Sequence, residues 1–140
     1  MSAPTTEGLL QIYDETSTIA VVGLSTNEQK PANIVPRYLQ EHGYRIVPVN
    51  PREQSLLGEQ SYPSLRDVDV PVDLVLVFRP AEEAPAIAEQ AVELGAKTLW
   101  LQDGIVSEDA RAIAETAGLT VVMDECMGRT HGTLGLGPGA

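Results

Sequence analysis

The sequence is short of several residue types, and each shortage narrows what the protein can be. Its 140 residues include one cysteine, Cys126, so an internal disulfide is excluded and a reducing, cytoplasmic setting is expected. Only 9 basic residues stand against 20 acidic ones, and the formal net charge of −11 argues against nucleic acid or an anionic membrane as a partner. No apolar run approaches the roughly 18–20 residues that span a bilayer, and the N-terminus lacks the pattern of a signal peptide.

Residues suited to catalysis are also scarce. The histidines are His42 and His131, and neither has a serine or cysteine partner by position, so a hydrolase triad is not expected. No His, Cys and Asp spacing resembles a metal site. Asp103, Asp124 and Glu125 could meet as an acid and a base, but solvated loop carboxylates are the commoner case. We therefore predict no catalytic residue and no metal.

What the sequence does contain is a regular alternation of buried strands and amphipathic helices. This alternation favours parallel strands with right-handed crossovers. We predict one α/β domain over residues 1–140, with a Rossmann-type, doubly wound parallel sheet of five strands. Numbered along the chain, the strands are expected in the order 3-2-1-4-5. The expected strands are 18–22, 44–50, 73–78, 97–101 and 120–123, and the expected helices are 6–14, 33–42, 81–94 and 107–117.

Capping and proline positions refine these elements. Thr5 or Thr6 is expected to cap the first helix, Ser107 the last, and Gly95 to end the helix over 81–94. Asn33 is expected to cap a helix that holds Pro36 in its first turn. Pro48 argues against a fully paired central position and is expected near the end of its strand. The stretch 51–71 is the least regular, with a short helix around residues 64–67. The glycine-rich tail, about 128–140, is predicted to be loose.

In such a sheet, ligands bind beyond the carboxyl ends of the strands. After the first strand come Gly23, Leu24, Ser25 and Thr26, and then Lys30 near a helix start. A strand, a glycine turn and a helix N-terminus can cradle a phosphate. The loop has one glycine where the dinucleotide fingerprint needs three, and it is not a P-loop. An ordinary turn remains the alternative.

The end of the second strand carries Val49, Asn50, Pro51 and Arg52. NAD-binding proteins usually have Asp or Glu here for the ribose hydroxyls. An arginine suits a ribose phosphate instead, although a solvated arginine in a turn is equally ordinary. Together the two loops favour a nucleotide with a ribose phosphate, which means coenzyme A or NADP.

Three further loops reach the same edge. Phe78-Arg79-Pro80 could offer an apolar face and a cation, or simply open a helix at the proline. Gly104 makes a tight turn that serves backbone shape or lets a ligand approach. Cys126 is either an idle thiol or a partner for a ligand thiol.

Taken in order, these short motifs resemble a known family. The likeness rests on Val22-Gly-Leu-Ser25, Lys30-Pro31, Val49-Asn-Pro51, Val77-Phe-Arg-Pro80, Leu99-Trp-Leu-Gln-Asp-Gly104 and Val122-Met-Asp-Glu-Cys126. Together they resemble the small stand-alone CoA-binding-domain proteins of bacteria and archaea, which are similar to the CoA-binding domain of the succinyl-CoA synthetase alpha subunit. The first loop has fewer glycines than the synthetase loop.

The resemblance implies a cofactor, coenzyme A, and a set of residues that would contact it. Lys30 and Arg52 would meet phosphate charge, and 102–105 would line the way toward the pantetheine arm. Ligase activity is not implied, because His131 does not match the setting of the synthetase's phosphorylated histidine. The residues implied for CoA binding are Gly23, Leu24, Ser25, Thr26, Lys30, Val49, Asn50, Pro51, Arg52, Phe78, Arg79, Pro80, Gln102, Gly104 and Ile105.

The leading hypothesis is therefore a cytoplasmic, non-catalytic protein that binds CoA or an acyl-CoA as a carrier, sensor or regulatory module. One alternative is an NADP-dependent or other nucleotide-using enzyme. Another is a docking domain that has kept the fold and lost its ligand. The protein partner is unknown, and the sequence leaves a homodimer open.

Overall fold

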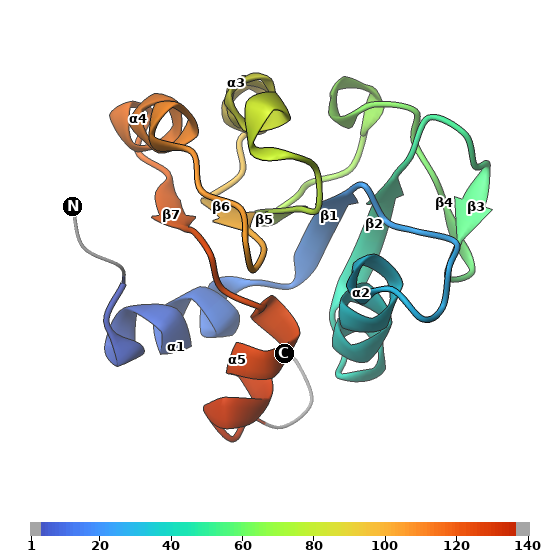
Figure 1. The fold of residues 1–140 in the computed structure, drawn as a ribbon, viewed down its shortest axis with the longest axis horizontal. Coiled ribbons are helices and arrows are strands. Elements are labelled where there is room, and N and C mark those ends of the chain that lie inside the picture. Colours follow the sequence, from blue (N-terminus) through green and yellow to red (C-terminus); the bar gives the residue numbers. More distant parts are fainter. Residues whose placement is uncertain (1–3, 137–140) are drawn as a thin grey trace.

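Five short apolar strands form the parallel sheet at the centre of the protein (Figure 1). A computed structural model describes residues 4–136. Nearly every strand residue is buried, as expected when helices cover both faces of a sheet. The predicted doubly wound α/β class is confirmed. The strands are β1 (Thr18–Val22), β2 (Arg45–Val49), β5 (Leu74–Val77), β6 (Thr98–Leu101) and β7 (Thr120–Val122).

The strand order differs from the prediction. The sheet runs β2-β1-β5-β6-β7, so the third predicted strand lies beside the first and not at the outer edge. Leu74 of β5 is paired with Ile19 of β1. The reason lies in Pro48, the fourth residue of β2, which has no N–H and is tolerated at the edge of a sheet. The predicted order would have required β2 to pair on both sides.

Helices cover the two faces of the sheet unequally. The helices α3 (Ala84–Leu94) and α4 (Glu108–Thr116) cover one face, above the sheet in Figure 1. The other face is covered by α1 (Thr6–Glu15), α2 (Pro31–Glu41) and α5 (Met127–Thr133). Side chains alternate along each strand between these two cores. None of the helices within residues 4–136 is both long and apolar enough to cross a membrane.

Several predicted helix ends are confirmed. The hydroxyl of Thr5 accepts a hydrogen bond from the N–H of Gly8, and that of Ser107 accepts one from Ala110. Gly95 ends α3 in the left-handed conformation, with φ of 83°. The short helices η1 (Leu65–Asp67) and η2 (Ala81–Glu83) are single turns, and the first is the turn predicted near residues 64–67.

The start of α2 corrects the prediction made for Asn33 and Pro36. The helix begins at Pro31, and Pro36 lies inside it. Because Pro36 has no N–H, it cannot bond the carbonyl of Ala32 one turn earlier. That carbonyl instead accepts the N–H of Ser25 at 3.1 Å, and the Asn33 amide donates to the Ser25 carbonyl at 2.7 Å. The proline and the asparagine thus attach the first loop to the helix.

Two further segments were not predicted. The chain forms a small hairpin from β3 (Ser55–Leu56) and β4 (Glu59–Gln60), whose turn holds Leu57 at φ of 53°. The predicted loose tail is instead helical in α5 up to Thr133, while residues 137–140 of that tail lie outside the described part. His131 of α5 is fully buried, and its Nδ1 lies 2.8 Å from the hydroxyl of Tyr38.

Candidate functional site

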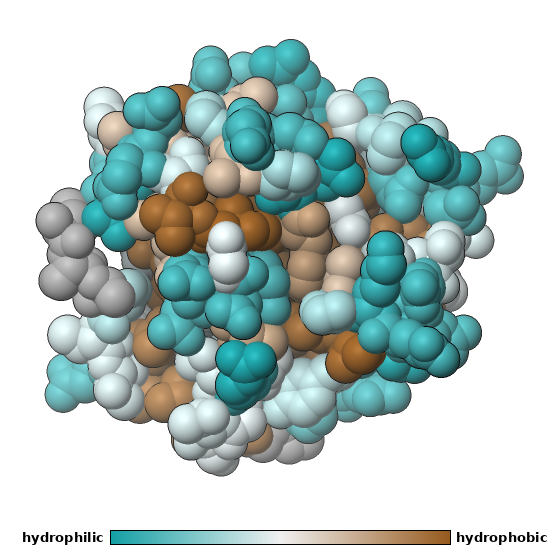
Figure 2. Space-filling view, viewed as in Figure 1, coloured by the Kyte–Doolittle hydropathy of each residue, from teal (hydrophilic) through white to brown (hydrophobic). Residues whose placement is uncertain are grey.

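A hollow opens where the strand order reverses. The helices that follow β1 and β5 leave toward opposite faces of the sheet, and this divergence creates a crevice at the carboxyl ends of the two strands. The hollow has a volume of about 330 Å³, within the range of ligand sites. Figure 2 shows hydrophobic surface in the middle of this face, flanked by hydrophilic side chains. The lining residues are Lys30, Pro31, Ala32, Phe78, Gln102, Asp103, Ile105, Cys126 and Arg129.

The loop after β1 reaches the hollow through Lys30. Gly23 has φ of 91°, and a Cβ on it would lie 2.9 Å from Cδ of Arg79, so the position requires glycine. Leu24 is fully buried in the core. The hydroxyl of Ser25 accepts the N–H of Asn27 at 3.0 Å. These residues shape the loop, and neither they nor the exposed Thr26 line the hollow.

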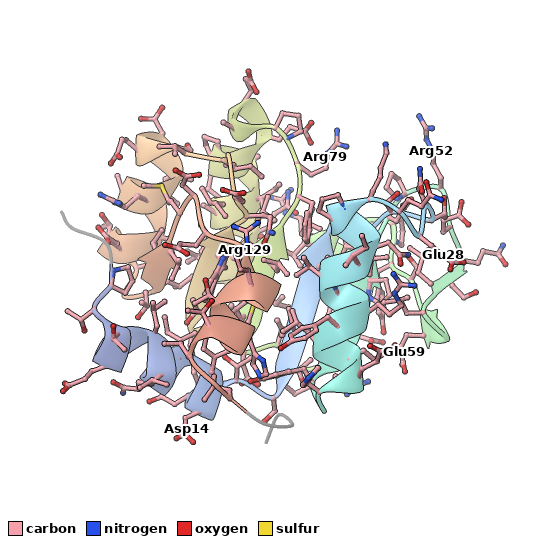
Figure 3. All side chains as sticks on the ribbon, turned by 60° about the horizontal axis from the view of Figure 1, so that its bottom comes forward. Asp14, Glu28, Arg52, Glu59, Arg79 and Arg129 are labelled. Atoms are coloured by element: carbon pink, nitrogen blue, oxygen red, sulfur yellow. The ribbon has the colours of Figure 1, made fainter. Side chains whose placement is uncertain are left out.

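The residues after β2 do not line the hollow. Val49 is buried, and the Asn50 side chain joins two loops: its amide nitrogen donates to the carbonyl of Leu24 at 2.9 Å, and its oxygen accepts the N–H of Arg52 at 2.8 Å. Pro51 and Arg52 are exposed beside it. Asn50 therefore replaces the usual acid with a structural cross-link, and Arg52 projects outward along the same edge as Arg79 (Figure 3).

The loop after β5 supplies an apolar wall and a cation that is already paired. Phe78 lines the hollow. Arg79 donates to both carboxylate oxygens of Glu83, at 3.0 and 2.7 Å. These hydrogen bonds lower the pKa of Glu83 and raise that of Arg79, against a smaller opposing effect of burial. Pro80 precedes η2 and lies outside the hollow.

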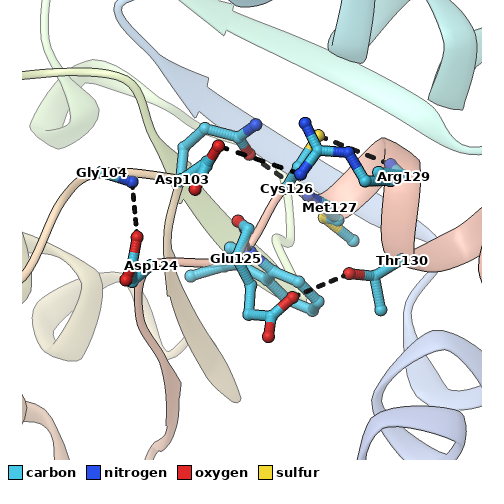
Figure 4. Close-up of polar contacts among 10 residues, drawn as sticks. Asp103, Gly104, Asp124, Glu125, Cys126, Met127, Arg129 and Thr130 are labelled. Atoms are coloured by element: carbon cyan, nitrogen blue, oxygen red, sulfur yellow. Dashed lines mark hydrogen bonds and ion pairs between the residues drawn. The ribbon is translucent and has the colours of Figure 1, made fainter.

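The loop after β6 is held from two sides. Gly104 has φ of 86°, and its N–H donates to the carboxylate of Asp124 at 2.7 Å (Figure 4). Ile105 lines the hollow, but Gly104 does not. Gln102 is only 4% exposed, and its side-chain oxygen accepts the N–H of Met127 at 3.2 Å. The predicted loop thus contributes Gln102, Asp103 and Ile105 to the lining of the hollow.

The acidic side chains on this rim are each engaged separately (Figure 4). Asp124 holds the turn at Gly104, and Glu125 accepts the hydroxyl of Thr130 at 3.0 Å. Asp103 lies 3.9 Å from the guanidinium of Arg129. Within residues 4–136, no group of His, Cys, Asp and Glu is placed to hold a metal ion.

The segment 125–127 is fixed from beneath by buried side chains. The Trp100 indole donates to the carbonyl of Glu125 at 2.9 Å, and the Tyr13 hydroxyl donates to the carbonyl of Met127 at 2.7 Å. Burial, followed by the nearby Tyr44, raises the pKa of Tyr13 well above its usual value, so the phenol remains a neutral donor. This support sets the position of Cys126 in the wall of the hollow.

Sequence reasoning missed Arg129, Pro31 and Ala32 as lining residues. Arg129 lies in the tail that was expected to be loose, and α5 brings it to the rim. Cysteine is not among the usual N-cap residues, so the sequence did not indicate that a helix begins after Cys126. Pro31 and Ala32 were missed because the predicted helix began at Asn33, two residues after the observed start of α2 at Pro31.

The order of the sheet, the crevice at its switch point and the cation-edged hollow define an open α/β domain of the nucleotide-binding type. The sequence matches the CoA binding domain family over residues 17–132, and the chain belongs to that family. The resemblance to CoA-binding-domain proteins noted in the sequence is thereby confirmed.

Its relatives fall into two groups. One group has the same length: the uncharacterised YneT protein of Bacillus subtilis is 37% identical over 94% of this chain and 97% of its own. A hypothetical protein from Pyrococcus horikoshii has a solved structure with a TM-score of 0.90 at 37% identity, covering 94% of this chain and 92% of its own. The other group is longer. ADP-forming acetate–CoA ligase I of Archaeoglobus fulgidus is 26% identical over 79% of this chain, which spans only 18% of the ligase.

Proposed function

We propose that the protein binds coenzyme A or an acyl-CoA in the cytoplasm, without transforming it, as a carrier, sensor or regulatory module. The observation that carries the proposal is the hollow at the β1–β5 switch point, in a chain that matches the CoA binding domain family over residues 17–132. A hollow of about 330 Å³ accommodates part of a CoA molecule, so the rest would lie along the rim.

The distribution of unpaired cations supports this assignment. Among the ion pairs found within residues 4–136, none involves Lys30, Arg45 or Arg52. Lys30 and Arg52 follow β1 and β2 at the carboxyl ends of the strands, whereas Arg45 begins β2 at its amino end. Lys30 and Arg52, which form no ion pair within residues 4–136, are therefore available to bind the phosphates of CoA.

The apolar wall suits the remainder of the ligand. Phe78 and Ile105 line the hollow, and either can pack against an adenine ring or an aliphatic arm. The rim carboxylates already have partners in Gly104, Thr130 and Arg129, which supports binding over acid–base chemistry. In this proposal Arg79 is occupied by Glu83 and contributes its stem more than its charge.

Calorimetry with the purified protein tests the proposal. CoA, acetyl-CoA, NADP and NAD are titrated separately under one set of buffer conditions. We expect saturable heat with CoA or acetyl-CoA and none with either dinucleotide. Heat with NADP and none with CoA would overturn the proposal and support the nucleotide-using enzyme. Native mass spectrometry of the protein as purified would identify a retained acyl-CoA directly.

A further inference from the structure

Cys126 is the single cysteine of the chain, and it lies in the wall of the hollow. Its sulfur accepts the N–H of Arg129 at 3.4 Å, which fixes the side chain at the start of α5. The residue is partly exposed, so a ligand can reach the sulfur. The buried contacts under residues 125–127 hold the backbone on which the sulfur stands.

Gln102 provides an independent indication of a ligand at the same place. Its side chain lines the hollow while 96% buried, and its oxygen is committed to the N–H of Met127. Because that partner is a donor, the oxygen must face it, and the amide NH₂ must point the other way. No protein acceptor is found for this NH₂ within residues 4–136. The NH₂ is not one of the fully buried, unpartnered side-chain groups of residues 4–136, so it is open to the hollow that Cys126 also lines. There it suits a ligand carbonyl, such as an amide of the CoA arm.

We propose that Cys126 is a thiol–disulfide exchange site for CoA bound in the hollow, an inference that rests on the proposed function. The Cys126 thiolate attacks one sulfur of a CoA disulfide, forming a Cys126–CoA disulfide and releasing the other CoA as its thiolate, which takes up a proton. One disulfide bond breaks and one forms, so the step needs no oxidant beyond the CoA disulfide. Reduced CoA or another thiol reverses it.

Recognition of the nucleotide would make the exchange selective. Phosphate contacts at Lys30 and an arm carbonyl held by Gln102 would place the ligand sulfur beside Cys126, so the reaction would occur at high effective concentration. A disulfide without a nucleotide gains nothing from these contacts. The structure thus predicts faster reaction with CoA disulfide than with glutathione disulfide.

The test follows labelling of the reduced 140-residue chain by intact mass spectrometry. Equal concentrations of CoA disulfide and glutathione disulfide are supplied in parallel. We expect one CoA per chain, added at least about tenfold faster than glutathione and removed by dithiothreitol. Cys126→Ser should abolish the label. Lys30→Ala and Gln102→Glu should slow labelling by CoA disulfide more than labelling by glutathione disulfide, and so reduce the preference for CoA, while Arg45→Ala leaves the preference unchanged.

The outcomes separate this inference from the proposed function. CoA binding by calorimetry, with no preference for CoA disulfide over glutathione disulfide, would overturn the exchange site and leave the binding function intact. Loss of CoA binding itself would instead remove the basis of both. Serine can replace cysteine as the helix N-cap, so Cys126→Ser should fold. Retention of CoA binding by this variant shows that it has folded.

Discussion

Arg52 offers the sharpest test at the scale of single residues. It is exposed at the rim and has no ion pair within the described part of the chain. If it binds the 3′-phosphate of CoA, Arg52→Ala should weaken CoA binding by about 1.5–3 kcal/mol, the scale of a charge-assisted hydrogen bond. Binding of dephospho-CoA should be nearly unchanged. Calorimetry with both ligands measures the difference.

Arg45 is the matched control for this experiment. It is the same residue type and also has no ion pair within residues 4–136, but it begins β2, at the end of the strand opposite to the end that Arg52 follows. Arg45→Ala should leave both affinities as they are. Equal losses for CoA and dephospho-CoA in Arg52→Ala would place Arg52 away from the 3′-phosphate.

The Arg79–Glu83 pair predicts a small, pH-dependent contribution to stability. Both side chains are close to half exposed, so Glu83→Gln should lower the free energy of unfolding by only about 0.3–0.5 kcal/mol at neutral pH. Arg79 lowers the pKa of Glu83 in the folded state. The contribution is therefore present above the carboxyl's unfolded pKa and lost as the pH falls through its lower folded pKa.

Urea unfolding of wild type and Glu83→Gln across the acid range measures this effect. The difference in unfolding free energy between wild type and Glu83→Gln should shrink toward zero as the pH falls. The exposed Glu89 lies on α3, and no ion pair involves it within residues 4–136, so Glu89→Gln serves as the control and should show no pH-dependent difference from wild type. A difference for Glu83→Gln that grows as the pH falls would contradict the assignment.

The residue types on the rim were readable from the sequence, but several of their roles were not. The absence of an acid at Asn50 was plain, yet its amide cross-links two loops, a fact that depends on the position of the Leu24 carbonyl. Lys30 and Phe78 do line the hollow as the loop argument suggests. Arg79 does not stand free, because Glu83 lies one helical turn later. Such partners depend on three-dimensional geometry that single motifs do not encode.

At the scale of elements, the docking of α5 is the feature that completes the site. The Tyr13 hydroxyl donates to the carbonyl of Met127 in a buried setting, so Tyr13→Phe removes a buried hydrogen bond that docks α5. We expect a loss of about 0.5–1.5 kcal/mol in the free energy of unfolding. Tyr62→Phe removes an exposed hydroxyl bonded to Asp69 and should cost no more than about 0.5 kcal/mol. Denaturant unfolding compares the two variants. Equal losses in unfolding free energy would show that the buried hydrogen bond stabilises the protein no more than the exposed one does.

Element positions were largely predictable, and the errors have identifiable causes. Runs of apolar residues and the caps at Thr5 and Ser107 located most strands and helices. Pro36 misled the prediction, because a proline inside a helix is rarer than one in its first turn. The hairpin turn at Leu57-Gly58 lacks the Asn-Gly signal of such turns. The last helix, α5, is rich in glycine and is held by tertiary contacts of His131 and Met127 more than by propensity.

At the scale of the whole molecule, the strand order decides where the ligand site lies. The predicted order would have placed the reversal between β1 and β6. The observed order places it between β1 and β5, which brings the Lys30 loop and Phe78 to one hollow. The proline in β2 was a sequence signal for an edge strand, but alternation alone does not fix the order of parallel strands.

The net charge makes a final prediction about binding kinetics. The formal charge of −11 repels an anionic ligand at long range, while Lys30 and Arg52 act at close range. Salt shortens the reach of this repulsion from about 30 Å at 0.01 M to about 8 Å at 0.15 M. The association rate constant of CoA should therefore rise with salt, opposite to the behaviour of a basic nucleotide-binding protein. Stopped-flow experiments with a fluorescent CoA conjugate at both salt concentrations measure it. A rate that falls with salt would show instead that the local field of the rim cations dominates the encounter.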